Sequence, residues 1–403
     1  IALDAVVTTV DGDVLLTSAD DISQTALITS TNGDIGLIAS DTITQTATGD
    51  ITTTDGDVLV DAGGHWTMDG AAEITAGGSD VLGQSGGTIT LGVIRVTDAA
   101  MNQIALSAAE SIVDGNSDSL NIEETVPGAA TSVSLRAGTG MIGGAGGTTS
   151  ATNAQALDLN VDTVAASSAT GVYLREVAAG GAIEVNTAAS VSVDIDGVVR
   201  SDFDSGTTDV SEDRMLSSLA DLTTGSNGAI KLVADDGTIT INGGGDATGV
   251  SADGPGDVLL ESRTGGTAGS DVVINAGVLS GTGHITLNAA DDVDINDVLT
   301  TGGTGTVYVL SGADTDVDAA ITSASGDILV DAGNDISQTA LITSTSGDVG
   351  VIAGQDVTQT ATGDITTTGG DVLVEATSGS LTMDGSAEIT AGGQDVLGLA
   401  GTN

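Results

Sequence analysis

The sequence repeats itself over a long interval. Of the 49 residues from 12 to 60, 35 are identical 314 positions later, at 326–374. Wherever an Ile, Leu or Val in the first copy changes, another of these three replaces it, as at Val14/Ile328. Most other differences exchange small or polar residues. A chain that keeps its aliphatic positions while its polar positions vary must fold as a repeat architecture, and it cannot be treated as ordinary globular domains.

A shorter period lies inside the long one. Units of 21 to 28 residues open with Gly-Asp followed by an aliphatic residue, and neighbouring units align directly. Clear openings begin at Gly12, Gly33, Gly56, Gly256, Gly326, Gly347 and Gly370. Each unit is too short to bury a hydrophobic face alone, so stacking of successive units must supply the core.

Within a unit the pattern is that of short β-strands. Residues 292–296 and 191–196 alternate polar and apolar types, which places one set of side chains inside and one outside. Gly, Asn, Asp and Ser interrupt the pattern as turn residues do. We therefore predict an all-β fold, a parallel β-solenoid with 21–28 residues per coil and a 314-residue super-repeat. A β-sandwich fits poorly, since its strands seldom align at a 21-residue offset.

The expected interior is unusual in composition. The chain has 60 glycines, no cysteine and only four aromatic residues, so Val, Ile, Leu and Ala must fill the core. Without cysteine there is no disulfide scaffold and no thiolate metal site. Gln24 and Gln45 stand one unit apart, as do Gln338 and Gln359, and we expect each pair to form an amide ladder.

The regularity of the repeat divides the chain into three regions. Residues 1–95 form regular coils, 96–265 form a less regular solenoid with loop insertions, and 266–403 are regular again. Residues 326–403 are a second copy of 12–95. Since this second copy has only begun when the sequence stops, we expect the chain to be a segment of a longer repetitive one.

The most divergent stretch, 200–228, is expected to project from the solenoid as a loop with a short helix. The residues that favour this helix are Ser211 as N-cap, Glu212 and Asp213 in the first turn, Met215, Leu216, Leu219 and Leu222 at helical spacing, and Gly225 as the stop. Two roles stay open for the projection, a flap over an exposed apolar coil or a lateral contact with a partner.

The charge excludes several functions. Fifty-seven acidic residues against seven basic ones give a formal charge of -50, which opposes sequence-independent nucleic-acid binding. The scarcity of aromatic residues removes the stacking platforms that bind single strands. No apolar run is long enough to span a membrane, so we expect neither nucleic acid nor membrane insertion among the partners.

Clustered aspartates are the candidate metal ligands. Carboxylate oxygens are the ligands that Ca²⁺ prefers, and no other cofactor is expected to be required. The candidate residues for weak Ca²⁺ binding are Asp291, Asp292, Asp294, Asp314, Asp316 and Asp318. An EF-hand loop is excluded, because Ala319 stands at the turn glycine and Ser325 at the closing glutamate. The competing interpretation is a solvated acidic face.

The stacked Gly-Asp openings raise an electrostatic problem. Aspartates on neighbouring coils repel by roughly 0.9 kcal/mol per pair in water. An aspartate at a turn can offset this repulsion by accepting backbone N–H groups, and screening or bridging cations would reduce it further. We therefore expect divalent cations to stiffen the protein.

Motifs for catalysis are weak. Gly138-x-Gly140-x-x-Gly143 matches a dinucleotide-binding fingerprint, yet the glycine-rich residues that follow make a poor helix start. No Ser/His/Asp set recurs, and the acids are too numerous for any pair to indicate glycoside hydrolysis. We expect no enzyme. The alternative is a carbohydrate-active β-helix enzyme, which would require basic and aromatic side chains converging in a groove.

The units that begin at Gly12 and Gly33 resemble the repeat regions of filamentous-haemagglutinin-like bacterial surface proteins. The resemblance implies a right-handed parallel β-helix and a structural role at the cell surface or outside the cell. On this basis we expect an extracellular fibre or adhesin segment, an acidic rod that provides length, stiffness and a repeated surface for cell-surface, cell–cell or matrix contact. Expected partners are further copies of the repeat, divalent cations and cell-surface glycans. A calcium-dependent component of a biofilm or surface layer is a further alternative.

Overall fold

The computed structural model describes most of the chain and divides it into two compact units. The described residues are 1–77, 80–97, 102–117, 119–126, 131–145, 155–178, 180–195, 200–201, 207–208, 211–263 and 269–401. Unit 1 comprises residues 1–168 and 187–219, and unit 2 comprises 169–186 and 220–403. The three regions expected from the sequence were defined by how regular the repeat is, not by compactness. Their boundaries at 95 and 265 do not coincide with the boundaries of the two units.

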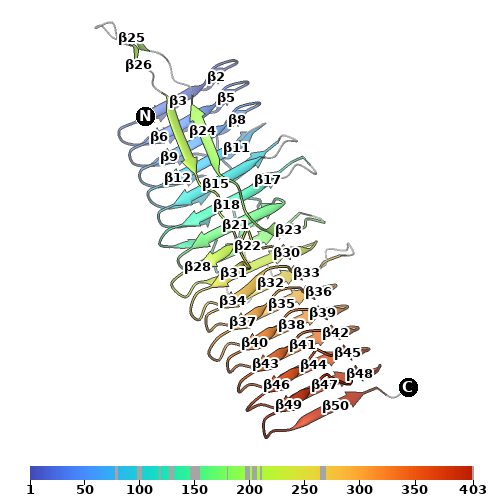
Figure 1. Cartoon of the computed structure of the whole chain (residues 1–403). Helices are drawn as coiled ribbons and strands as arrows, with labels where there is room; N and C mark the ends of the chain where they lie inside the picture. The colour runs from blue at the N-terminus through green and yellow to red at the C-terminus, as the bar shows by residue number, and fades with distance from the viewer. Residues whose placement is uncertain are drawn as a thin grey trace. The chain divides into compact units, whose positions relative to one another are not determined.

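Unit 1 consists of stacked coils of three strands, and each strand pairs in parallel with its counterpart one coil away (Figure 1). The first ladder contains β3 (Val14–Ser18), β6 (Ile35–Ala39), β9 (Val58–Ala62), β12 (Val81–Ser85), β15 (Gln103–Ala108), β18 (Ser132–Ala137) and β21 (Thr163–Ser168). The second contains β1 (Ala2–Leu3), β4 (Ile22–Gln24), β7 (Ile43–Gln45), β10 (Trp66–Met68), β13 (Ile89–Leu91), β16 (Ile112–Asp114) and β19 (Met141–Ile142). The third contains β2 (Val7–Thr9), β5 (Ile28–Ser30), β8 (Ile51–Thr53), β11 (Glu73–Ala76), β14 (Val93–Val96), β17 (Ile122–Glu124) and β20 (Leu157–Asn160).

Unit 2 is built in the same way. Its first ladder contains β22 (Gly171–Glu176), β29 (Ala229–Ala234), β32 (Val258–Ser262), β35 (Ile285–Ala289), β38 (Val307–Ser311), β41 (Ile328–Ala332), β44 (Val349–Ala353), β47 (Val372–Ala376) and β50 (Val396–Ala400). The second contains β23 (Ile183–Val185), β30 (Ile239–Ile241), β33 (Val272–Ile274), β36 (Val293–Ile295), β39 (Thr315–Val317), β42 (Ile336–Gln338), β45 (Val357–Gln359) and β48 (Leu381–Met383). The third contains β28 (Leu222–Thr224), β31 (Thr248–Ala252), β34 (Gly277–Ser280), β37 (Leu299–Thr301), β40 (Ile321–Ser323), β43 (Ile342–Ser344), β46 (Ile365–Thr367) and β49 (Ile389–Ala391).

The predicted parallel β-solenoid is therefore confirmed. In the regular regions the register equals the sequence period, as where Val14 pairs with Ile35. Two coils of unit 1 are longer than the expected maximum of 28 residues, because Ile104 pairs with Val133 and Val133 with Val164. The extra residues lie between strands, so the ladders continue in register.

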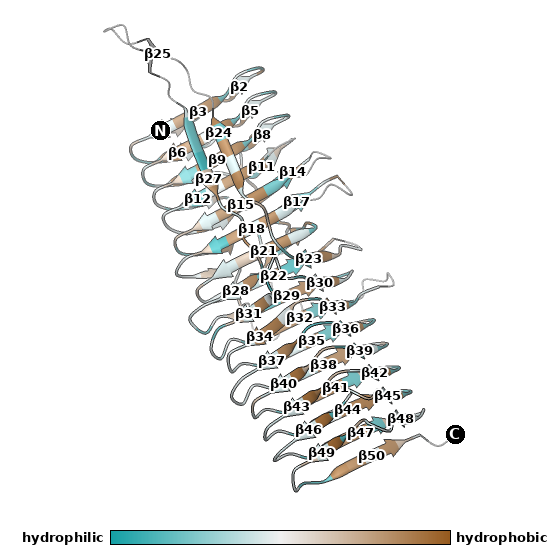
Figure 2. Ribbon diagram, viewed as in Figure 1, coloured by the Kyte–Doolittle hydropathy of each residue, from teal (hydrophilic) through white to brown (hydrophobic). Residues whose placement is uncertain are grey.

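The interior consists of aliphatic stacks, as expected. Residues at alternate strand positions are buried, and the same positions carry aliphatic side chains in successive coils. Figure 2 shows hydrophobic residues recurring in the strands of successive coils. Ile22 and Ile43 are one such stacked pair, with 1% and 0% exposure. Removing apolar surface from water stabilises the fold by about 25 cal/mol per Å². Each coil buries the aliphatic surface of its neighbours, so neighbouring coils stabilise one another.

The two predicted amide ladders are present. Gln45 Nε2 donates to Gln24 Oε1 at 3.2 Å, and Gln359 Nε2 donates to Gln338 Oε1 at 2.9 Å. All four side chains are buried, which strengthens hydrogen bonds by excluding water. In unit 1 the indole N–H of Trp66 completes the ladder by donating to Gln45 Oε1 at 2.9 Å.

The glycines of the Gly-Asp openings are required by close approach between coils. A Cβ added to Gly33 would overlap the carbonyl oxygen of Gly12, and one added to Gly56 would overlap that of Gly33. The hydroxyl of Ser30 links these corners, because it accepts the N–H of Gly33 at 2.9 Å and donates to the oxygen of Gly12 at 3.3 Å. Glycine is therefore required where the coils approach this closely, as at Gly33 and Gly56.

The projection predicted within 200–228 is not helical. Residues 212–216 form β27 (Glu212–Leu216), which pairs antiparallel with β24 (Val191–Ile195), and β25 (Arg200–Ser201) pairs with β26 (Thr207–Thr208). An antiparallel bridge joins Ala188 to Leu219. The helix prediction that rested on Ser211, Glu212, Asp213, Met215, Leu216, Leu219, Leu222 and Gly225 is therefore wrong.

The helix prediction failed because residues 212–216 alternate between exposed and partly buried positions, as a β-strand does, while the apolar residues of this stretch also fit helical spacing. Met215 is 65% exposed, whereas Leu216 packs against a cluster of unit 1. That cluster contains Val191 and Val193 of β24 together with Leu59 and Leu82 on the outer face of the first ladder. Of the two roles left open, the structure shows the flap: a β-hairpin covers outward-facing apolar residues of the coils.

Trp66→Leu is expected to lower the free energy of unfolding by roughly 2–4 kcal/mol. The change leaves a cavity beside Gly83, whose missing side chain makes room for the indole ring, and it removes the donor to Gln45 Oε1. Urea unfolding followed by circular dichroism measures the loss. Thr67→Ser, at the neighbouring outward position, is the matched control, and an equal effect of both changes would contradict this account.

Candidate functional site

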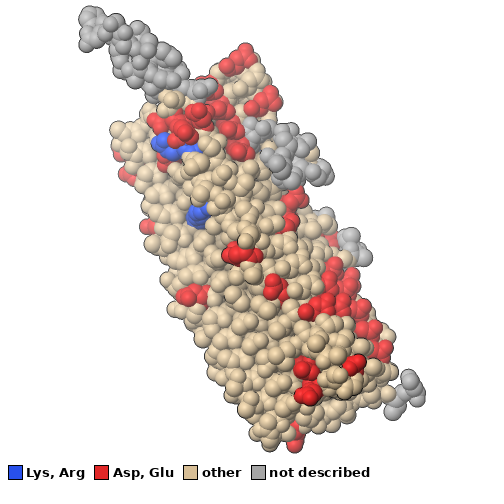
Figure 3. Space-filling model, in the orientation of Figure 1, with Lys and Arg blue, Asp and Glu red and all other residues tan. Residues whose placement is uncertain are grey.

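Aspartates form rows at the corners of the coils. Figure 3 shows acidic side chains gathered along one edge of unit 2, over the ends of β33, β36 and β39. Each row contains the residue that precedes the same strand in successive coils, so its spacing is the coil period. The carboxylates therefore lie one above another, and their arrangement determines what the surface can bind.

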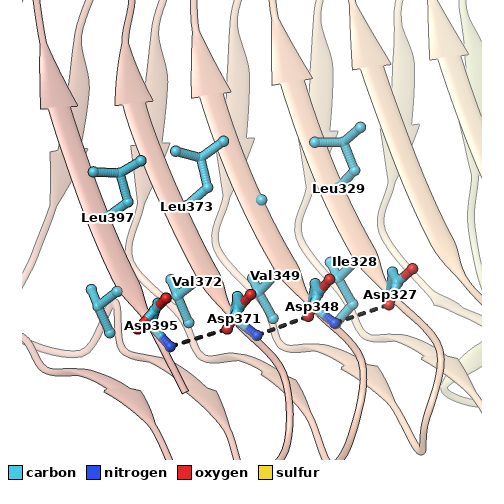
Figure 4. A pocket seen from close by; sticks show the side chains of 12 residues that line it. Asp327, Ile328, Leu329, Asp348, Val349, Asp371, Val372, Leu373, Asp395 and Leu397 are labelled. Carbon is cyan, nitrogen blue, oxygen red and sulfur yellow. Dashed lines mark hydrogen bonds between the residues drawn. The ribbon is translucent and has the colours of Figure 1, made fainter.

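The row at the Gly-Asp openings is held by backbone hydrogen bonds. In unit 1 the N–H groups of Asp34, Asp57, Asp80 and Gln103 each donate to the carboxylate one coil earlier, at 2.7–3.0 Å. In unit 2 the N–H groups of Asp348, Asp371 and Asp395 do the same at 2.8–3.0 Å, as Figure 4 shows. The backbone N–H groups expected to offset carboxylate repulsion are therefore in place.

A second row contains two of the six predicted metal ligands, Asp292 and Asp314. The N–H of Asp292 donates to Asp271 at 3.2 Å, that of Asp314 to Asp292 at 2.8 Å, and that of Asp335 to Asp314 at 3.1 Å. Carboxylate oxygens of Asp271, Asp291 and Asp292 all lie within 4.8 Å of one another, close enough to share a cation. Sequence reasoning identified Asp291 and Asp292 but missed Asp271.

The other predicted ligands lie apart from this group. Asp294 and Asp316 are register partners on β36 and β39, with side chains on the outer face. Asp318 follows β39 and accepts the hydroxyl of Thr339 at 2.7 Å. Asp314 contributes to the row without joining the group of three. The six candidate residues thus lie on two successive coils.

Carboxylates on the acidic surface of unit 2 repel one another, and this repulsion affects their pKa values. Burial raises the pKa of Asp292, Asp294 and Asp316, and the surrounding carboxylates raise each pKa further. For Asp294 the carboxylates that contribute are Asp316, Asp292, Asp271 and Asp318. A divalent cation would relieve such repulsion. Calcium binding here stays a prediction.

A second acidic group occurs in unit 1, where Asp20, Asp21 and Asp41 bring their carboxylates together on the exposed surface. The super-repeat replaces it. Asn334 and Gln355 stand at the positions of Asp20 and Asp41, and Gln355 Nε2 donates to Asn334 Oδ1 at 3.1 Å. An exchange of carboxylates for an amide pair marks these positions as adaptable surface.

The five arginines whose side chains are described are engaged in ion pairs or hydrogen bonds with the fold, whereas Lys231 is exposed on β29. Arg95 bridges Glu73 and Glu123, Arg175 pairs with Asp235, Arg214 pairs with Asp61 and Glu212, and Arg263 pairs with Asp235 and Glu261. Arg136 donates to the carbonyl oxygens of Ser217 and Ser218 at 2.6 and 2.9 Å. These contacts fasten coils and the hairpin, which is a structural use of charge.

The described aromatic residues are separated along the coils. Trp66 is completely buried in the amide ladder, Tyr173 is 8% exposed, and Tyr308 is partly exposed on the outer face of β38. Phe203 lies outside the described residues. Gly138 to Gly140 follow β18 as a turn, and among the described residues no helix begins there, so the dinucleotide fingerprint lacks the element that it requires.

Comparison with protein families, curated proteins and solved structures finds no match to this chain. Within the described ranges there is no helix long and apolar enough to cross a membrane. The functional proposal therefore depends on the coils and their surfaces.

Asp80→Asn is expected to stabilise the protein at neutral pH. Burial, followed by the charge of Asp57, raises the pKa of Asp80 from 3.8 to about 6. Because its pKa is raised in the folded state, the contribution of Asp80 to the free energy of unfolding is most favourable below about pH 4. This contribution is lost as Asp80 ionises towards pH 7. Asparagine keeps the acceptor for the N–H of Gln103 without the charge, so a gain on the order of 1 kcal/mol at pH 7 is expected after screening.

Melting curves from pH 4 to pH 7 measure this effect. The variant should lose part of the pH dependence that the unmodified chain shows. Asp13→Asn, in the same row, is the control for loss of one negative charge. An equal gain from both variants would assign the effect to net charge and would contradict the role of burial.

Millimolar calcium at low salt is expected to raise the melting temperature by about 2–4 °C over that in chelator. The double change Asp271→Asn and Asp291→Asn should remove most of this rise, because it takes two charges from the group of three. The pair Asp11→Asn and Asp384→Asn removes the same charge outside both groups of three and should leave the rise unchanged. Identical melting in calcium and chelator would refute the cation prediction.

Proposed function

We propose that this chain is a structural segment of an extracellular fibre or adhesin at a bacterial surface. Its coils would provide length, stiffness and a repeated surface for cell-surface, cell–cell or matrix contact. Its partners would be further copies of its own repeat, together with divalent cations and cell-surface glycans. The chain would act without catalysis.

The observation that carries this proposal is what the super-repeat preserves. Both copies keep the inward aliphatic residues, the buried glutamine pair and the N–H-bonded aspartate row. They do not keep the acidic group of Asp20 and Asp41, nor His65, which Gly379 and its neighbours replace. Residues that stack coils are repeated, whereas residues that could make a local site vary, as expected of a chain selected for architecture.

Stiffness follows from the hydrogen bonding. Within each unit an inner coil pairs with the coil before it and the coil after it through three strands. Bending such a stack requires lengthening main-chain hydrogen bonds and separating aliphatic layers at the same time. The exposed acids and hydroxyls keep the sides soluble and discourage lateral pairing. The resemblance to filamentous-haemagglutinin-like repeats agrees with this proposal.

The enzyme alternative finds less support. It requires a groove where basic and aromatic side chains converge, and the arginines with described side chains are engaged in pairing the fold's own carboxylates and carbonyls. The groove of about 700 Å³ in unit 2 is lined by aspartate and aliphatic residues. Neither set provides the stacking and hydrogen bonding that a polysaccharide needs.

Electron micrographs of the native material, with hydrolysis assays on a panel of polysaccharides, test the proposal. Thin unbranched fibres with no hydrolysis are the expected result. Discrete particles that release reducing sugar would overturn it in favour of the enzyme. Particles without activity would also contradict the fibre.

A further inference from the structure

The outer face of the first ladder carries an apolar stripe in unit 1. Leu15, Gly36, Leu59 and Leu82 occupy the second position of β3, β6, β9 and β12 and are register partners. They point away from the aliphatic interior, yet Leu59 and Leu82 have no exposed surface. The β24–β27 hairpin covers them, and Val191, Val193 and Ile195 provide the covering side chains.

The hairpin is seated by a notch and an ion pair. Ile195 lies over Gly36, since a Cβ added to this glycine would stand 3.2 Å from Ile195 Cγ1. Arg214 Nε donates to Asp61 Oδ2 at 2.8 Å and reaches Glu212 with a second nitrogen. The apolar stripe, the glycine notch and the acid thus form one complementary surface for a hairpin.

The same surface recurs in unit 2. Leu329, Gly350, Leu373 and Leu397 occupy the second position of β41, β44, β47 and β50 in an equivalent register. They form the floor of the groove of about 700 Å³, with Asp327, Asp348, Asp371 and Asp395 along its margin (Figure 4). Glu375 stands where Asp61 stands in the first copy, so the acid is retained.

In the described part of the chain this second surface is open. Leu397 is 52% exposed, and Leu329 and Leu373 are partly exposed, in contrast to the buried Leu59 and Leu82. At Gly350 only Leu329 lies near an added Cβ, because no counterpart of Ile195 fills the notch. An exposed apolar groove that keeps the notch and the acid is typical of an interaction surface.

We propose that the groove over β41, β44, β47 and β50 is a docking site for a second β-hairpin with the sequence pattern of residues 187–219. The occupant carries β-branched residues at alternate positions of one strand, to cover Leu329, Leu373 and Leu397 and to enter the notch at Gly350. It carries an arginine on the other strand to pair with Glu375. This inference is independent of the fibre proposal, since it concerns a surface that would bind a hairpin whatever the chain's role.

The test appends a second copy of residues 187–219 to the C-terminus of the full chain, through a flexible linker of about 15 residues. The chain contains no cysteine, so one introduced thiol reports on the groove. Leu373→Cys should react rapidly with an alkylating reagent in the unextended chain, whereas Leu59→Cys, under the existing hairpin, should react slowly. Appending the hairpin should slow alkylation at Leu373→Cys at least tenfold.

Two further variants make the result specific. Val193→Asp in the appended copy alone should restore rapid alkylation, because it places a charge on the covering face without affecting the hairpin already in unit 1. Glu375→Lys should also restore it, since the lysine repels the arginine, while Asp384→Lys should not. Unchanged alkylation of Leu373→Cys on appending the hairpin would overturn the proposal, and so would equal protection by the Val193→Asp copy.

Discussion

The structure depends on in-register parallel stacking of coils. Once the strands of one coil pair with those of the next at equal positions, every side chain acquires a counterpart about 4.8 Å away. Aliphatic residues then form continuous inner stacks and glutamines form amide ladders. The same geometry forces like charges together on the surface. The chain meets this cost with backbone N–H groups, which the aspartate rows accept from the following coil.

Surface variation is therefore constrained by position within the coil. Corners accept glycine because carbonyl oxygens of the previous coil leave no room for a side chain, as at Gly33. The outer face of the first ladder accepts apolar residues only where something covers them, as the hairpin covers Leu59. Unit 1 and unit 2 have the same apolar surface on the first ladder, covered by a hairpin in unit 1 and open in unit 2. The covered surface indicates what kind of segment the open one would bind.

Most of the fold was predictable because a 21-residue offset aligns strands that pair in space. The hairpin was not, since Met215, Leu216 and Leu219 satisfy helical spacing as well as alternation, and the deciding factor was the apolar stripe far away in the sequence. Of the three residues in the acidic group of unit 2, Asp291 and Asp292 were predicted from the sequence and Asp271 was not. Asp271 lies one coil before Asp292 and could have been found from the period, whereas the raised pKa of Asp80 depends on burial, which no local pattern reports.

Distances between spin labels on the third ladder of unit 2 test the stacking most directly. The chain has no cysteine, so label pairs can be introduced at Thr300 with Thr366, Thr300 with Thr390, and Ser251 with Thr390, which are three, four and six strand pairings apart. The account predicts that the mean distance rises linearly by about 4.8 Å per coil. Distances that do not increase in equal steps with coil number would contradict it.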